Sequence, residues 1–125
     1  LVAADPSLRN LLAPVIAALP DRAEALQVVE TLFEAGAGVH PNRFEILAAI
    51  AAQLDDPELA LRIWRHELEG TRLRLMRIWG PAYADMRRLP GFARLMTEIR
   101  LPPYWREFGW PDRCRPAGEQ DFECF

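Results

Sequence analysis

Apolar side chains in the first part of the chain recur at the three- and four-residue spacing of α-helices. One run begins at Asp5-Pro6 and extends to Leu19, and the next begins at Pro20-Asp21 and ends at Gly36. Aspartate caps a helix, proline suits its first turn, and glycine commonly ends it. The apolar face of the second run consists of Ala25, Leu26, Val29, Leu32 and Phe33. The pattern therefore predicts two helices joined by a short turn.

The following segment predicts a second pair of helices. Residues 44–54 (FEILAAIAAQL) are apolar almost all round, which is typical of a buried helix. A turn and cap follow at Asp55-Asp56-Pro57, and residues 58–70 then place Leu61, Trp64 and Leu68 on one face. No segment alternates between apolar and polar residues over the length of a strand. The sequence therefore predicts an all-α domain without strands.

The two predicted helix pairs repeat one another. Ala13 and Ala25 are 12 residues apart, as are Ala48 and Ala60, and the two pairs are offset by 35 residues. Small residues at such positions let paired helices approach closely, so we expect each alanine pair to face across a tight contact. A period of about 34 residues with this pattern resembles the tetratricopeptide (TPR) repeat. The signature positions of the TPR repeat match Leu12, Ala13, Ala25 and Val29 in the first unit and Leu47, Ala48, Ala60 and Trp64 in the second.

The resemblance has departures within residues 6–72. The aromatic residue usual before the leucine is Phe44 in the second unit but Arg9 in the first, and Arg72 stands where a proline normally ends the unit. What the resemblance implies is two helical hairpins stacked as an α-solenoid, in which the first helix of each hairpin lines a concave face.

After Gly70 the chain carries large apolar residues and prolines in a distinctive order. They are Leu75, Trp79, Pro81, Arg87, Pro90, Phe92, Leu95, Leu101, Tyr104, Trp105, Pro111, Asp112 and Cys114. This order resembles the end of bacterial multi-TPR chains attached to winged-helix regulators or nucleotide-cyclase-type signalling modules, although Arg100 replaces a common glycine. The resemblance implies one domain over residues 1–125, with TPR-like hairpins in 1–70 and a C-terminal helical cap and tail in 71–125. Because the chain starts at Leu1, we expect it to be a fragment of a longer protein.

The stretch YWREFGWPDRC, residues 104–114, is either the rim of an active site or a plug that closes the helical domain. The last helix of a solenoid leaves an apolar face uncovered, and terminal elements must cover it. We therefore expect Trp105 to be buried against the last hairpin, near residues such as Trp64, Leu68 or Leu75.

Charge is distributed unevenly along the chain. The formal net charge is −3, but residues 1–61 carry −6 and residues 62–100 carry +5. A basic middle segment could bind nucleic acid or anionic lipid, or it could pair with the acidic first half or cover helix faces with arginine stems. We expect no nucleic-acid binding, because domains with that function are usually net basic. We also expect no membrane insertion, since no apolar run approaches the roughly 20 residues needed to cross a bilayer.

Cys114 and Cys124 are the only cysteines. They could close a small loop as a disulfide, or they could remain free thiols in a reducing cytosol. The resemblance favours the disulfide, because TPR tails of this type often lie outside the inner membrane. It therefore favours the periplasm over the cytoplasm.

The sequence carries no catalytic signature. His66-Glu67-Leu68-Glu69-Gly70 begins like the zinc motif HExxH, but Gly70 stands in place of the second histidine, and His40 has no partner by spacing. The scattered glycines form no phosphate loop. We therefore predict no catalytic, metal or cofactor site, and no enzyme activity.

The function expected from these features is protein–protein interaction or scaffolding within a larger regulatory or signalling protein. The partner would be a protein, a peptide or the protein's own N-terminal domains, and oligomers are possible. The alternatives are a small-molecule sensing domain and a helical enzyme subunit. The TPR register predicts that the binding groove is lined by Ser7, Asn10 and Ala17 in the first unit and by Asn42, Glu45, Ala49 and Gln53 in the second. None of these is cationic, so we expect no clamp for a peptide's C-terminal carboxylate.

Overall fold

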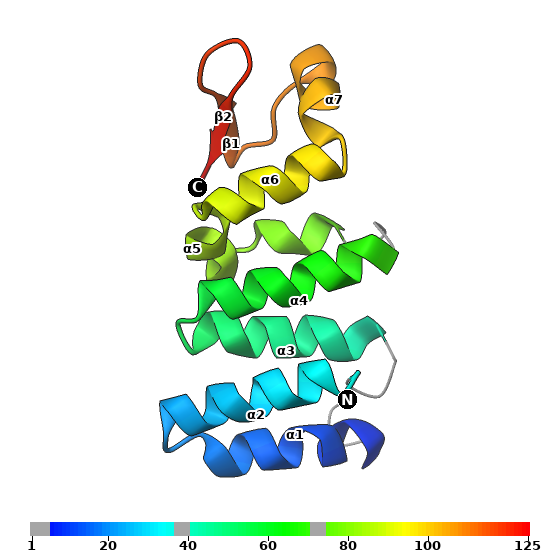
Figure 1. Cartoon of the computed structure of the whole chain (residues 1–125), viewed down its shortest axis with the longest axis vertical. Coiled ribbons are helices and arrows are strands. Elements are labelled where there is room, and N and C mark those ends of the chain that lie inside the picture. Colours follow the sequence, from blue (N-terminus) through cyan, green and yellow to red (C-terminus); the bar gives the residue numbers. More distant parts are fainter. Residues whose placement is uncertain (1–5, 37–40, 71–74) are drawn as a thin grey trace.

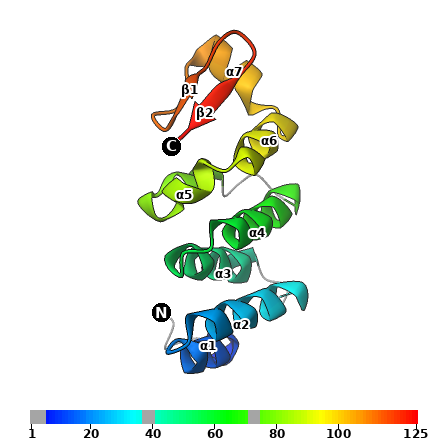
Figure 2. The same ribbon diagram turned by 60° about the vertical axis from the view of Figure 1, so that its left-hand side comes forward.

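The computed structural model describes residues 6–36, 41–70 and 75–125, and it is mostly helical with a small two-stranded sheet. Figures 1 and 2 show the helices following one another along the long axis, from α1 at one end to α7 and the β-hairpin at the other. The first four helices are α1 (Pro6–Ala18), α2 (Arg22–Glu34), α3 (Pro41–Gln53) and α4 (Pro57–Gly70). Two 3-10 helices follow, η2 (Leu75–Trp79) and η3 (Pro81–Tyr83). The chain ends with α5 (Ala84–Arg87), α6 (Pro90–Glu98), α7 (Leu101–Phe108) and the strands β1 (Cys114–Pro116) and β2 (Phe122–Cys124).

The predicted caps begin and end α2. The side chain of Asp21 accepts a hydrogen bond from the Glu24 amide at 3.2 Å, which satisfies a free donor of the first turn. Gly36 follows the helix with a φ of 88°, a left-handed conformation that glycine adopts at low cost. Residues 19–21 connect α1 to α2, and residues 54–56 connect α3 to α4, so both connections are the short turns that the sequence predicts.

The core is continuous through the stack, and α3 and α4 share its most extensive helix contact. Ala48 and Ala60 are both fully buried, as the predicted tight contact requires. The corresponding expectation for Ala13 is wrong, because this residue is exposed although Ala25 is buried. Among the described residues α1 is the outermost helix of the stack and packs chiefly against α2 (Figure 1).

Ion pairs connect the acidic first half of the chain to the basic segment after it. Arg62 of α4 contacts Glu30 and Glu34 of α2, and Arg65 contacts Glu98 of α6. The two contacts of Arg62 agree with the interpretation that arginines of residues 62–100 pair with the acidic half, whereas Glu98, the partner of Arg65, lies within residues 62–100 itself. Each pair is exposed and contributes little by itself, but together the pairs place α4 between its neighbours.

The C-terminal part forms its own aromatic cluster on top of α6. Trp105 is only 6% exposed, which confirms that it is buried. Its ring contacts are with Trp79 at 6.1 Å, Trp110 at 5.6 Å and Phe122 at 5.9 Å. The ring contact of Trp64 is instead with Tyr83, at 5.9 Å. The ring contacts of Trp105 thus lie within residues 75–125 and do not include Trp64.

The two short strands correct the expectation of a purely helical chain. β1 and β2 pair antiparallel, with Cys114 opposite Cys124, and a disulfide joins these two residues. Three-residue strands are too short to show an alternating pattern, so no strand signal was visible in the sequence.

Candidate functional site

Two hollows on the surface bring polar side chains together with exposed apolar ones. The larger has a volume of about 650 Å³, and its lining residues are Glu45, Ile46, Ala49, Trp64, Met76, Arg77, Gly80 and Tyr83. A neighbouring hollow of about 400 Å³ is lined by Leu19, Ala49, Ile50, Gln53 and Leu54. Ala49 of α3 lines both hollows, so they lie next to each other, and we call the two together the α3 groove.

The α3 groove contains three of the residues that the repeat register predicts for the inner face. Glu45, Ala49 and Gln53 lie one helical turn apart on α3 and line it in that order. Asn10 and Ala17 are exposed on α1 and are not among the lining residues. The side chains of Ser7 and Asn42 lie outside the described residues.

Residues beyond the two repeats complete the groove, and the sequence reasoning missed them. Met76 and Arg77 come from η2 and Tyr83 from η3, and Met76 is 84% exposed. The only signal in the sequence was that Met76, an apolar residue, stands among the arginines of RLRLMRIW, residues 72–79. Arg77 thus adds a cation to a lining whose predicted residues include none.

Arg77 and Glu45 form a charged pair at one end of the groove. Nε of Arg77 lies 3.3 Å from Oε1 of Glu45, whose side chain is only 12% exposed, whereas that of Arg77 is largely exposed. The pKa of Tyr83 is raised above its ordinary value, chiefly by burial and also by the negative charge of Glu45, while the nearby Trp64 indole opposes the shift. The phenol of Tyr83 is therefore a neutral hydrogen-bonding group at physiological pH.

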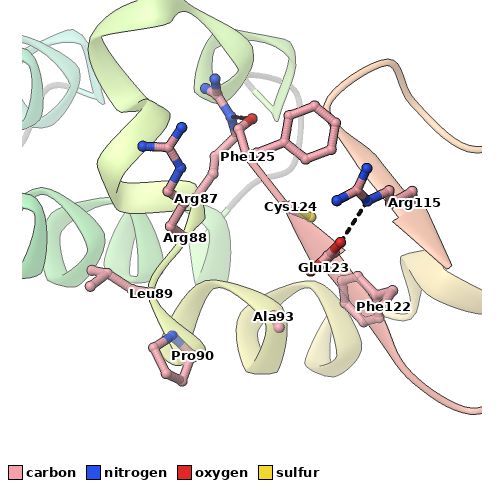
Figure 3. A pocket seen from close by; sticks show the side chains of 10 residues that line it. All are labelled: Arg87, Arg88, Leu89, Pro90, Ala93, Arg115, Phe122, Glu123, Cys124 and Phe125. Carbon is pink, nitrogen blue, oxygen red and sulfur yellow. Dashed lines mark hydrogen bonds and ion pairs between the residues drawn. The ribbon is translucent and has the colours of Figure 1, made fainter. Parts of the chain in front are cut away.

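A separate hollow of about 450 Å³ lies between the β-hairpin and the α5–α6 turn, and we call it the C-terminal hollow (Figure 3). Its lining residues are Arg87, Arg88, Leu89, Pro90, Ala93, Arg115, Phe122, Glu123, Cys124 and Phe125. The predicted disulfide pair thus borders this hollow through Cys124. Arg115 and Glu123 face each other across the hairpin as an ion pair with 2.5 Å between Nε and Oε1.

Arg87 forms buried hydrogen bonds in the wall of the C-terminal hollow. Its guanidinium, in a residue only 3% exposed, donates to the main-chain oxygens of Phe125 at 2.8 Å, Ile78 at 2.9 Å and Gly80 at 2.7 Å. Burial lowers the pKa of Arg87 from its ordinary value, and the charges of Arg113 and Arg88 add to the shift. This side chain therefore ties the end of β2 to the turn between η2 and η3.

The remaining sequence candidates show no site chemistry. The ring of His66 packs against Phe33 at 5.6 Å and Phe44 at 4.9 Å, and His40 lies outside the described residues. Within residues 6–36, 41–70 and 75–125, no group of three or more His, Cys, Asp or Glu side chains is arranged to hold a metal ion. No helix in these ranges has both the length and the apolar character needed to cross a bilayer.

Comparison with protein-family models, curated proteins and solved structures finds no match to this chain.

Proposed function

We propose that the domain is a protein-interaction module and that the α3 groove binds a short segment of a partner protein. In this proposal α1–α4 are two TPR-like hairpins of a regulatory or signalling protein, and the elements after Gly70 cover the end of the stack. The observation that supports it most is the groove itself, which combines apolar side chains with a few polar groups at its wall.

The dimensions of the groove suit a short peptide. From Glu45 to Gln53 the groove follows α3 over eight residues, or about 12 Å at the rise of an α-helix. An extended segment of about four residues spans the same length. The exposed Met76 provides a flexible and polarizable contact of the kind used by adaptable binding surfaces.

The charges in the groove argue against recognition of a free C-terminal carboxylate. Arg77 is the cation among the lining residues, and its guanidinium is already paired with Glu45. We expect internal segments to bind, with apolar side chains entering the groove. A peptide and its C-terminally amidated form should therefore bind equally well.

Substitution of Ala49 tests the proposal, because this residue lies where the two parts of the groove meet. Peptides selected on the native domain from a random display library should bind Ala49→Arg at least about tenfold more weakly, since the new side chain fills the groove. The matched control is Ala13→Arg, which adds the same side chain to an exposed helical alanine outside the lining. Fluorescence anisotropy gives the affinities, and thermal melting verifies that both variants fold. Unchanged binding to Ala49→Arg, or no enriched peptide, would contradict the proposal.

The second candidate is a small-molecule sensor, and the larger part of the groove favours it. Its volume of about 650 Å³ is typical of small-molecule sites, and Glu45 and Tyr83 supply polar groups among apolar walls. Gln53→Arg separates the two functions, because Gln53 lines only the smaller part. A peptide that spans both parts loses affinity for this variant, whereas a compact ligand next to Tyr83 does not.

A further inference from the structure

The sulfur-bearing side chains differ sharply in their exposure to solvent. The sequence has three methionines and two cysteines, and all five lie within the described residues. Met86 and Met96 are only 1% and 0% exposed, and the two cysteines are well buried and joined to each other in the disulfide. Met76, in contrast, is 84% exposed. It is therefore the sulfur-bearing residue of the domain that a dissolved oxidant reaches directly.

Met76 lies where the polarity of its side chain affects the α3 groove. It belongs to η2 and lines the larger part of the groove, together with the apolar residues Ile46 and Ala49 of α3. Among the described residues, no other large apolar side chain is as exposed. Side chains with so little packing usually contribute little to stability. A chemical change at Met76 should therefore alter the surface of the groove and leave the core intact.

Oxidation of the thioether is such a change. In the reaction with hydrogen peroxide, a lone pair of the sulfur attacks one peroxide oxygen, an S–O bond forms and the O–O bond breaks. The sulfur is oxidised by two electrons to the sulfoxide, and the second oxygen leaves as water with both protons. The sulfoxide is polar and chiral, so it disrupts apolar interfaces in which methionine takes part. A partner that covers its oxygen without a hydrogen bond loses the hydration of that oxygen.

We propose that Met76 is a selective oxidation site and that its conversion to the sulfoxide by a peroxide weakens binding of the partner segment in the α3 groove. The effect on binding rests on the function proposed above, whereas the selectivity of the reaction depends only on the exposure of the three methionines. Methionine sulfoxide reductases reverse the modification. The control of the groove is therefore reversible.

Mass spectrometry measures the selectivity, because trypsin places each methionine on a separate peptide: residues 75–77, 78–87 and 95–100. The folded domain is treated with hydrogen peroxide, the reaction is stopped, and the unfolded chain is digested. Residues 75–77 should gain one oxygen atom at least about tenfold faster than the methionines of the other two peptides, since those are shielded by the core. The melting temperature should not change. Equal oxidation rates at the three methionines would overturn the proposal.

Binding measurements test the consequence. Peptides enriched on the native domain should bind the oxidised domain about five- to tenfold more weakly, and treatment with the reductase should restore their affinity. Met76→Leu removes the sulfur, so this variant should have the same affinity before and after peroxide. Met76→Gln introduces a polar side chain of similar length and should bind about as weakly as the oxidised native domain, without any peroxide.

The variants also separate this proposal from the function on which it rests. If Ala49→Arg abolishes binding while oxidation of Met76 leaves it unchanged, the groove remains the binding site and the control by Met76 is refuted. A loss of affinity after peroxide in Met76→Leu would assign the sensitivity to another residue and refute it as well. If no peptide is enriched, the effect on binding falls together with the proposed function, and the tryptic peptides still decide whether Met76 is the selective site.

Discussion

Replacing Arg87 with methionine should destabilise the domain substantially, because this side chain joins Phe125 at the end of β2 to Ile78 and Gly80 by three hydrogen bonds. Hydrogen bonds to charged groups contribute about 1.5–3 kcal/mol each, and Arg87 makes three to main-chain oxygens. The cost of burying its charge offsets several kcal/mol of that sum. The net loss in the free energy of unfolding should therefore be about 2–4 kcal/mol, a large part of the 5–15 kcal/mol typical of a domain.

Urea unfolding followed by far-ultraviolet circular dichroism measures this loss. The matched control is Arg88→Met, because Arg88 is adjacent in sequence but exposed, with a single ion pair to Asp85. It should change the free energy of unfolding by no more than about 0.5 kcal/mol. Arg87→Lys should be intermediate, since an ammonium lacks the planar fork that reaches several acceptors. If Arg87→Met and Arg88→Met unfold at the same urea concentration, the role assigned to Arg87 is wrong.

Three further predictions concern the core. Trp105→Ala should lower the free energy of unfolding by about 3–5 kcal/mol, because this side chain is buried. Tyr104→Ala, at the exposed neighbouring residue, should have little effect. Equal urea midpoints for the two variants would contradict the burial of Trp105. Ala60→Leu should cost about 1–3 kcal/mol by overpacking the α3–α4 contact, and an unchanged melting temperature would show that this contact is not tight. Because the pKa of Tyr83 is raised in the folded state, stability should fall as pH rises above about 10, where the unfolded phenol ionises. The urea midpoint should therefore fall less steeply above about pH 10 in Tyr83→Phe than in the native protein. An identical fall in both proteins would contradict the raised pKa of Tyr83.

The helices were predictable because their signals are local and repeated. Apolar periodicity, the aspartate cap at Asp21 and the glycine at Gly36 all act within a few residues, and α2 has the predicted bounds to within about two residues. The burial of Ala48 and Ala60 was also predictable, because an internal helix pair meets neighbours on both sides. The same reasoning failed for Ala13, since a repeat register does not say which unit lies at the end of the stack.

The groove was only partly predictable for a related reason. Glu45, Ala49 and Gln53 follow from helical periodicity on α3, but Met76 and Arg77 reach the groove through a chain reversal after α4. Where such a reversal places a side chain depends on tertiary packing, which no local pattern encodes. The strands were missed because three residues carry no measurable period.

Arg100 shows how a departure from a sequence pattern acquires a structural meaning. The resemblance places a glycine at this position, and in the structure Arg100 has a φ of 66° between α6 and α7. This left-handed conformation is the one that favours glycine. An arginine therefore occupies a backbone conformation that glycine would adopt with less strain.

The aromatic cluster of the C-terminal part gives the protein a built-in optical reporter. Trp79, Trp105 and Trp110 form a chain of ring contacts at 6.1 and 5.6 Å, while Trp64, the fourth tryptophan, lies on α4 with Tyr83 as its ring contact. Indoles this close couple electronically, so their absorption bands produce an exciton signal that an isolated indole lacks. Loss of that signal would report the separation of α7 and the hairpin from η2, and the emission of Trp64 would report α4. One chain without any added dye can thus reveal whether α4 and the C-terminal elements unfold together or in sequence.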